Sequence, residues 1–424
     1  MTIHPKMRHT YVGIDSHRDT HTAVFIDCFF EKLGEITFKN RPSEFPAFLS
    51  DALKLRQDDT DLLFGLEDVS MYGRTLSVFF QKNNLRIKHV NSLLVSRERK
   101  NQNVTEKTDS VDAECAARVL LSKLSELPDA QLDDKYWILR TLVTHRDFIV
   151  KQNASSKNHL HNLVVQHYPN YCELFPNIDA KSALAFFKRY PSPTTLDGTT
   201  HEELAKFLSE ASDYRVGAGK PGEVKAREIL EGLQDTAVEF QEIRDEAVRT
   251  SIRHIEYNTG EVKKLDKAIA LFLAEFDCTL TSMAGIDIIA AAQLLACIGD
   301  IKKFPTPAKL ARYSGVAPVS YSSGRKDTQY ANKRGNRELN SILYLLAVRL
   351  ITTLGPTGKM MNPFFYEYYH KKLSEGKTKR QALKCVQRRL VNIIWTMLTN
   401  HEEYVNPPMF EAPEKETAKK AVKS

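Results

Sequence analysis

The chain has 424 residues, 42% of them apolar and 27% charged, and its net charge is +7. This length exceeds one ordinary hydrophobic core, so two or three domains are expected. The sequence has no run of about 18 apolar residues and no apolar leader, which argues against a membrane span or export and predicts a cytoplasmic protein. Its six cysteines are scattered without a C-x-x-C pair, which argues against a disulfide or zinc scaffold.

The first 130 residues alternate between strand-like and helix-like patterns. Strands are expected at residues 11–15, 22–28, 35–38, 61–66 and 85–90, and helices at 45–55, 76–81 and from 110 onward. Short β-rich or apolar runs predict the strands, and apolar side chains three or four residues apart predict the helices. The order β-β-β-α-β-α-β predicts an α/β domain over residues 1–130.

Residues 131–278 have the pattern of long amphipathic helices. One helix is expected at 136–163, and a second at 225–276 that is broken or bent near 258–260. The Gly- and Lys-rich segment 215–223 is expected to be an exposed loop within a helical insert. This region therefore predicts a helical or coiled-coil linker between two domains.

Residues 279–405 form a third, basic and mostly helical region. A small-residue helix at 290–296 lies between Gly285 and Gly299, a pattern that resembles a helix-hairpin-helix element. Such turns let backbone amides approach a phosphate. Residues 406–424 alternate Glu and Lys without apolar anchors, which predicts a disordered tail. The fold class expected for the whole chain is α/β plus α.

Four acidic residues in the N-terminal domain are candidates for a metal site. Asp15 and Glu67 each end a predicted strand, and Asp109 and Asp112 stand three apart at a helix start. Positions i and i+3 share one helix face, so the last two carboxylates can converge. Carboxylate oxygens are the ligands that Mg²⁺ prefers, and Mn²⁺ accepts the same set. Spacing alone leaves open the alternative that each acid is a surface or helix-capping residue.

A Ser- and Gly-rich segment at 313–326 is the second candidate. Ser322 and Ser323 precede Gly324, and a serine hydroxyl can attack a phosphodiester when cations stabilise the developing charge. Four nearby basic side chains are expected to contact phosphates: Arg325, Lys326, Lys333 and Arg334. The alternative is a flexible turn that binds phosphate through its backbone.

Taken together, these motifs resemble the DEDD transposases of insertion sequences. The N-terminal motifs are Tyr-Val-Gly-Ile-Asp at 11–15, Gly-Leu-Glu at 65–67 and Lys-Thr-Asp-Ser-Val-Asp-Ala at 107–113. The C-terminal motifs are Tyr-Ser-Gly-Val-Ala-Pro at 313–318, Ser-Gly at 323–324 and Lys-Arg-Gly-Asn at 333–336. The family includes the Piv and MooV DNA invertases and the RNA-guided bridge recombinases. The resemblance covers nearly the whole chain.

The resemblance implies roles for these residues. The first domain would be RuvC-like, that is, ribonuclease H-like, with Asp15, Glu67, Asp109 and Asp112 as the tetrad that binds Mg²⁺ or Mn²⁺. The second would supply a serine nucleophile that links covalently to DNA, at Ser323 immediately before the glycine, or at Ser322 if the register is counted back from Lys333.

The resemblance also implies partners: the DNA of element ends and target, a guide RNA transcribed from the element, and further copies of this chain in a dimer or tetramer. The long helices suggest the hypothesis that one chain's serine works with another chain's acids. A bacterial, nucleoid-associated location follows. The alternative function is a metal-dependent, structure-selective DNA nuclease, like a Holliday-junction resolvase, without a covalent intermediate.

Overall fold

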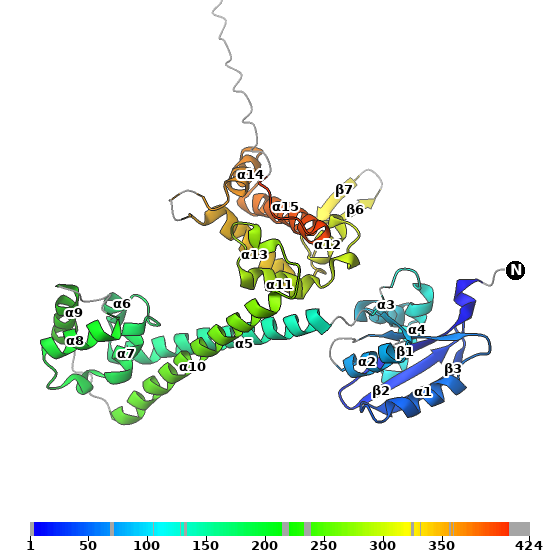
Figure 1. The fold of residues 1–424 in the computed structure, drawn as a ribbon, viewed down its shortest axis with the longest axis horizontal. Coiled ribbons are helices and arrows are strands. Elements are labelled where there is room, and N and C mark those ends of the chain that lie inside the picture. Colours follow the sequence, from blue (N-terminus) through cyan, green and yellow to red (C-terminus); the bar gives the residue numbers. More distant parts are fainter. Residues whose placement is uncertain are drawn as a thin grey trace, which may run out of the picture. The chain divides into compact units, whose positions relative to one another are not determined.

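A computed structural model describes residues 4–67, 72–104, 106–127, 129–130, 134–213, 220–232, 239–323, 326–330, 332–355, 358 and 360–406. The chain divides into two compact units, Met1–Trp137 and Ile138–Ser424. The first is an α/β unit, and the second is helical apart from one hairpin (Figure 1). In the described ranges, no helix combines the length and apolar character that crossing a membrane requires.

The first unit is built on a five-stranded mixed sheet in the order β3-β2-β1-β4-β5. Strands β1, β2 and β3 are antiparallel neighbours, whereas β4 runs parallel to β1 and β5 runs parallel to β4. The strands are β1 (His9–Ser16), β2 (Thr20–Ile26), β3 (Lys32–Lys39), β4 (Asp61–Leu66) and β5 (Arg86–His89). All five strands predicted from the sequence are confirmed.

Helices cover both faces of this sheet (Figure 1). They are α1 (Phe45–Lys54), α2 (Arg74–Lys82), α3 (Ser92–Asn101) and α4 (Asp109–Ser122). Successive strand residues point to opposite faces, so Val12 packs with Phe45 and Phe80 of α1 and α2, whereas Tyr11 packs in a separate cluster with Ala113 of α4. The three predicted helices are confirmed, and α3 is an additional helix that the sequence pattern did not indicate.

Two long helices, α5 (Asp134–His167) and α10 (Gln241–Leu273), lie side by side and antiparallel. Arg146 Nε donates to Asp266 Oδ1 at 2.5 Å, and Arg244 Nη1 donates to Gln166 Oε1 at 3.2 Å, so numbering rises along one helix as it falls along the other. Of the two alternatives predicted at 258–260, a broken or a bent helix, the break is wrong, because α10 runs through these residues without interruption. Burial of its apolar stripe, including Ile255 and Ile269, outweighs the roughly 1 kcal/mol that a glycine costs inside a helix.

A small helical insert connects α5 to α10. It contains α6 (Tyr171–Leu174), α7 (Lys181–Arg189), α8 (His201–Ala211) and α9 (Lys220–Glu231) around a buried aromatic cluster that includes Phe175, Phe186 and Phe187. The exposed loop predicted at 215–223 is wrong in its second part, because α9 begins at Lys220. Residues 214–219 lie outside the described residues.

The remaining described residues form helices around one hairpin. The helices are α11 (Ile288–Ile298), α12 (Pro307–Tyr313), α13 (Arg337–Thr352), α14 (Pro363–Ser374) and α15 (Lys379–Asn400), and the strands are β6 (Val319–Ser323) and β7 (Lys326–Tyr330). Short 3₁₀ turns occupy Pro5–Arg8, Pro193–Leu196, Leu280–Ser282 and Ile301–Lys303. Within the segment predicted to resemble a helix-hairpin-helix, the structure has one α-helix, α11. The predicted tail lies outside the described residues from 407 onward.

Beside this hairpin, the backbone at Gly335 crosses the backbone at Gly315 at close range. A Cβ at Gly335 would overlap the backbone nitrogen and Cα of Gly315, which itself has the left-handed φ of +70° that favours glycine. Backbone atoms on both sides leave nothing flexible that can move aside. The crossing therefore fixes the segment before α13 against the segment after α12.

We expect Gly335→Ala to destabilise the protein by about 1–3 kcal/mol, the usual range for overpacking a tight contact. Gly260→Ala is a matched control, because a Cβ there meets open space in the middle of α10. That substitution should stabilise the protein by roughly 0.5–1 kcal/mol through helix propensity. Urea-unfolding midpoints measure both changes. Equal midpoints for Gly335→Ala and wild type would show that the crossing is not tight.

Candidate active site

Asp15 and Glu67 lie at the same edge of the sheet, on neighbouring strands. The last parallel pair between β1 and β4 joins Ile14 to Leu66, so the next residues on each strand are Asp15 and Glu67. Alternation along the strands places both acids on the face of Gly13 and Gly65, which α4 covers. The structure thus brings together two of the predicted metal ligands.

Helix α4 brings the other two acids to this edge. Thr108 caps the helix, its hydroxyl accepting a hydrogen bond from the Val111 amide at 3.2 Å, and Asp109 and Asp112 occupy the first turn. The helix can lie against β1 because residue 13 is glycine: a Cβ there would overlap the carbonyl oxygen of Ala113 and the amide nitrogen of Ala117. Asp112 is buried, whereas Asp109 is exposed at the rim.

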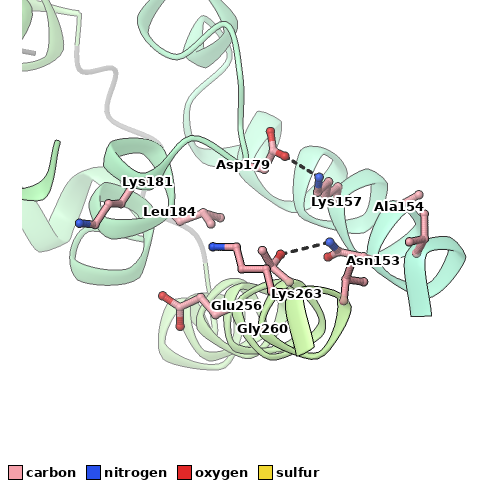
Figure 2. Close-up of a pocket in the computed structure, with 12 residues that line it drawn as sticks. Asn153, Ala154, Lys157, Asp179, Lys181, Leu184, Glu256, Gly260 and Lys263 are labelled. Atoms are coloured by element: carbon pink, nitrogen blue, oxygen red, sulfur yellow. Dashed lines mark hydrogen bonds and ion pairs between the residues drawn. The ribbon is translucent and has the colours of Figure 1, made fainter. Parts of the chain in front are cut away.

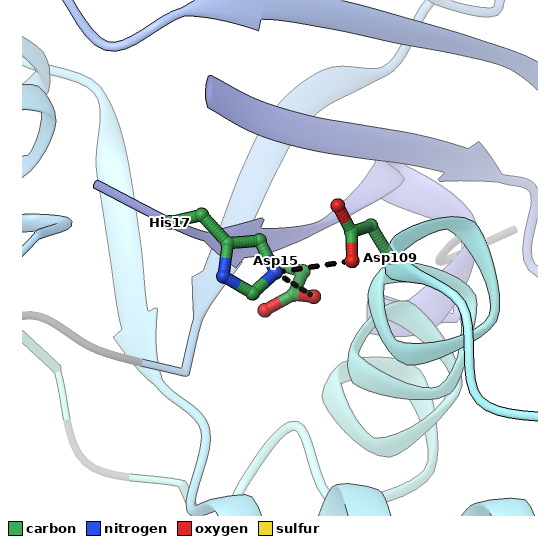
Figure 3. A group of neighbouring side chains, drawn as sticks. All are labelled: Asp15, His17 and Asp109. Atoms are coloured by element: carbon green, nitrogen blue, oxygen red, sulfur yellow. Dashed lines mark hydrogen bonds and ion pairs between the residues drawn. The ribbon is translucent and has the colours of Figure 1, made fainter. Parts of the chain in front are cut away.

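His17 joins the cluster from the residues after Asp15 (Figure 3). Its Nε2 lies 3.2 Å from Asp15 Oδ2 and 3.1 Å from Asp109 Oδ1. One donor atom from each of the three residues falls within 4.8 Å of the other two, which is close enough to share one cation. His17 was not among the ligands predicted from the sequence, although its position two residues after Asp15 is a signal.

Burial and the charges of neighbouring acids make Asp15 and Glu67 hard to ionise. The pKa of Asp15 is raised by burial first and then, against the opposing effect of His17, by the charges of Asp109 and Asp112. The pKa of Glu67 is raised by burial and by the charges of Asp15 and Asp112. Since Asp15 and Glu67 are both close enough to the neighbouring carboxylates to be affected by their charge, the four acids form one cluster, which a bound cation would stabilise.

Arg99 is the cationic partner inside the cluster. Its Nη1 pairs with Asp112 Oδ1, and both side chains are largely buried. Arg99 comes from α3, the helix that the sequence pattern did not indicate. It neutralises part of the charge of the deepest acid and fixes that carboxylate against the edge of the sheet. Sequence spacing gives no signal for this pairing, because it depends on how α3 packs against α4.

The predicted serines lie on a hairpin in the second unit. Ser322 pairs with Asp327, and Ser323 pairs with Lys326 as the last pair before the turn. The Ser- and Gly-rich segment, predicted as a loop, is therefore corrected to an antiparallel hairpin with both serines on its first strand. Gly324 and Arg325 lie outside the described residues. Lys333 and Arg334 lie exposed in the turn before α13.

A separate cavity of about 740 Å³ lies between α5, α7 and α10 (Figure 2). Charged groups at its wall pair with each other or with neighbours: Lys157 Nζ lies 2.5 Å from Asp179, and Glu256 lies 2.6 Å from Lys188. Asn153 Nδ2 donates to Thr259 Oγ1 across the two long helices at 3.2 Å. These contacts join the insert to the long helices.

Two family models match the chain. The IS110 DEDD model, described as a transposase, matches residues 12–169, which include all four acids. A model described as the transposase IS116/IS110/IS902 family matches residues 278–369, which include both serines. Together they cover more than half of the chain. The protein is a transposase, an enzyme that acts on DNA. It belongs to the IS110/IS116 family of insertion-sequence transposases, as the motifs indicated.

Individual relatives agree with this assignment. The chain is 23% identical to the uncharacterized 44.8 kDa protein of insertion element IS116 of Streptomyces clavuligerus, over 94% of this chain and 96% of the relative. It is 26% identical to the uncharacterized 43.6 kDa protein of insertion element IS110 of Streptomyces coelicolor, over 70% and 72%. It is 28% identical to a pilin gene-inverting protein of Moraxella bovis, over 30% and 37%.

Proposed function

We propose that this transposase excises and inserts its insertion sequence through a metal-bound carboxylate tetrad and a serine nucleophile. The observation that carries the proposal is the convergence of Asp15, Glu67, Asp109 and Asp112 at one edge of the sheet. The sheet order, with three antiparallel strands followed by two parallel ones, supports a RuvC-like, ribonuclease H-like first domain.

The donor set fits Mg²⁺ or Mn²⁺. Asp15 and Asp109 present carboxylate oxygens to one point, and the pKa of Asp15 is raised first by burial and then by the charges of Asp109 and Asp112, which a divalent cation would offset. Hard cations take oxygen ligands in this way. A divalent ion held by these acids would supply charge stabilisation to the attacking and leaving oxygens of a phosphodiester. Arg99 holds Asp112 in place for that role.

The serine step is a transesterification. The hydroxyl oxygen of Ser323 forms a bond to phosphorus, the bond from phosphorus to a deoxyribose oxygen breaks, and that oxygen takes up a proton while the serine hydroxyl loses one. Ser322 is the alternative nucleophile. Successive strand residues belong to opposite faces of the hairpin, so one DNA strand approaching one face meets one of the two serine positions.

The partners follow from the same proposal. Element-end and target DNA would contact Arg325, Lys326, Lys333 and Arg334 through phosphates, a guide RNA from the element would read sequence by base pairing, and two or four copies would assemble. The name of the Moraxella relative, which describes inversion of a gene, supports recombination rather than simple cleavage. Such a complex would work at the bacterial nucleoid.

The test is denaturing electrophoresis of the full chain incubated with Mg²⁺, labelled element-end DNA and RNA transcribed from those ends. We expect a protease-sensitive DNA adduct with wild type, lost in Ser323→Ala and retained in Ser322→Ala. Loss in Ser322→Ala alone would reassign the nucleophile. Metal-dependent cleavage with no adduct in any lane would favour the structure-selective nuclease instead.

Mixing two inactive variants tests whether the site is shared between subunits. Asp15→Ala chains lack the tetrad and Ser323→Ala chains lack the nucleophile, so neither forms an adduct alone. If one chain's serine works with another chain's acids, mixed oligomers should recover up to about a quarter or half of the wild-type adduct. Mixed samples as inactive as each variant alone would place both parts of the site within a single chain.

A further inference from the structure

A basic groove lies beside the serine hairpin, between α13 and α15. Its volume is about 750 Å³, and its walls come from the Gly315–Gly335 crossing, from the turn before α13, and from one face of each helix. The faces are regular: Arg337, Asn340 and Tyr344 form one stripe on α13, and Arg380, Lys384 and Gln387 form another on α15. Spacings of three and four residues put each set on a single side of its helix.

The groove carries four cations and no acid. Lys333, Arg337, Arg380 and Lys384 line it, and none of them forms an ion pair within the described part of the chain. Burial, and then the charge of Arg380, lowers the pKa of Lys384. A half-buried ammonium beside the exposed Arg380 is unfavourable without a counter-charge, so the groove suits an anionic ligand.

Polar and aromatic groups line the same groove. Gln387 is 1% exposed, and its amide nitrogen has no hydrogen-bond partner among the described residues. Asn340 already donates to the Ser314 carbonyl at 2.7 Å, which leaves its side-chain oxygen as an acceptor. Tyr344 is 48% exposed and presents a ring on which a base can stack. Amides, a ring and cations together match a nucleotide better than a simple anion.

Other basic residues of α15 serve the fold instead. Arg388 Nη1 donates to the Pro307 carbonyl at 3.2 Å, Arg389 lies over the Phe364 ring, and Trp395 Nε1 donates to the Phe304 carbonyl at 2.7 Å. These contacts fix the C-terminal half of α15 against the rest of the unit. The basic side chains of α15 that are available to a ligand are therefore those of its N-terminal half, Arg380 and Lys384, which line the groove.

We propose that this groove binds the phosphodiester backbone of a DNA strand and delivers it to the serine hairpin. Gly315 lies four residues before β6 and Asn332 two residues after β7, so the hairpin leaves the domain at the wall of the groove. A five-residue strand spans roughly 16 Å, which sets the reach from groove to serine. The inference refines the proposed function by naming a DNA subsite for the serine step.

The test is binding of a labelled single-stranded oligodeoxynucleotide to the full chain, followed by fluorescence anisotropy across a salt series with EDTA present. We expect Arg380→Gln/Lys384→Gln to lower the slope of log affinity against log salt by about 1.4, because each phosphate contact on a single strand contributes about 0.7. The control is Lys377→Gln/Lys379→Gln, which removes the same charge at and just before the start of the same helix, outside the groove, and should leave the slope near wild type.

Further variants separate contact from folding. Lys384→Arg keeps the charge and should keep the slope, whereas Tyr344→Ala should weaken binding several-fold without changing the slope. An unchanged slope in the groove variant, or an equal loss in the control, would overturn the proposal. If Arg380→Gln/Lys384→Gln weakened binding only to RNA of the same sequence, the assignment of the groove to DNA would also be wrong. Since no cleavage is measured, a failed serine adduct would not affect this result.

Discussion

Asp15→Asn is expected to abolish metal-dependent DNA cleavage while making the metal-free protein more stable. The substitution keeps the size of the side chain but removes a charge that is buried beside Asp109 and Asp112. Charge stabilisation by a bound divalent ion is worth several kcal/mol, so its loss should lower the cleavage rate by a factor on the order of 10³ or more. Removal of a buried charge that the neighbouring acids repel should raise the free energy of unfolding.

The dependence of stability on pH tests the same prediction. Since the folded-state pKa of Asp15 lies above its unfolded value, the folded state binds the proton more tightly. The metal-free wild type should therefore gain stability as the pH falls from the folded toward the unfolded pKa, and lose that contribution as the pH rises. Asp15→Asn should remove this part of the profile.

Thermal melting with and without Mg²⁺ measures the stability effect, and cleavage of element-end DNA measures activity. Mg²⁺ should raise the melting temperature of wild type but not of Asp15→Asn. The control is Asp19→Asn, the same chemical change at an exposed residue paired with Arg18, which should alter neither quantity. A destabilised Asp15→Asn protein that still responds to Mg²⁺ would contradict the assignment of Asp15 as a ligand.

The sheet and the positions of its acids could be predicted because both depend on local pattern. Short apolar runs identified β1 and β4, which are buried along almost their whole length, and an acid at the end of each run is visible in the sequence. Two parallel strands then bring Asp15 and Glu67 to one edge by geometry alone. The first turn of α4 was predictable for the same reason, since Asp109 and Asp112 share a helix face.

The partners of those acids could not be predicted, because they depend on packing between elements. Arg99 reaches Asp112 from α3, a short polar helix in which Val95 is the buried residue, so the segment has no strong apolar period. His17 follows β1 in a turn and reaches Asp109 only once α4 is in place. Such contacts are properties of the assembled domain rather than of any segment.

The serine hairpin was misjudged for a different reason. Its strands are rich in serine and flank a glycine, a composition typical of loops, and they contain few of the apolar residues that usually signal a strand. The two segments nevertheless pair through their backbones, from Val319 with Tyr330 to Ser323 with Lys326, and so form a hairpin. In α10 the opposite error occurred, because Gly260 weakens a helix locally but does not break one whose long apolar stripe is buried.

Gly13→Ala should have the largest structural effect of any single methyl addition in the first unit. The added Cβ would overlap the Ala113 carbonyl oxygen and the Ala117 amide nitrogen, both backbone atoms of α4. The helix must then move away from β1, so we expect a loss of about 3 kcal/mol or more in the free energy of unfolding. Because α4 carries Asp109 and Asp112, the same displacement should separate them from Asp15 and Glu67.

Urea unfolding and Mn²⁺ binding, followed by electron paramagnetic resonance, measure these two consequences. Gly34→Ala is the matched control, because its Cβ meets only the end of the Leu55 side chain, which can rotate aside. That variant should lose under about 1 kcal/mol and keep its metal affinity. If Gly13→Ala lost stability yet bound Mn²⁺ as wild type does, the close approach of α4 to β1 would serve the fold alone, and the position of the tetrad would have to depend on other contacts, such as the Arg99–Asp112 pair.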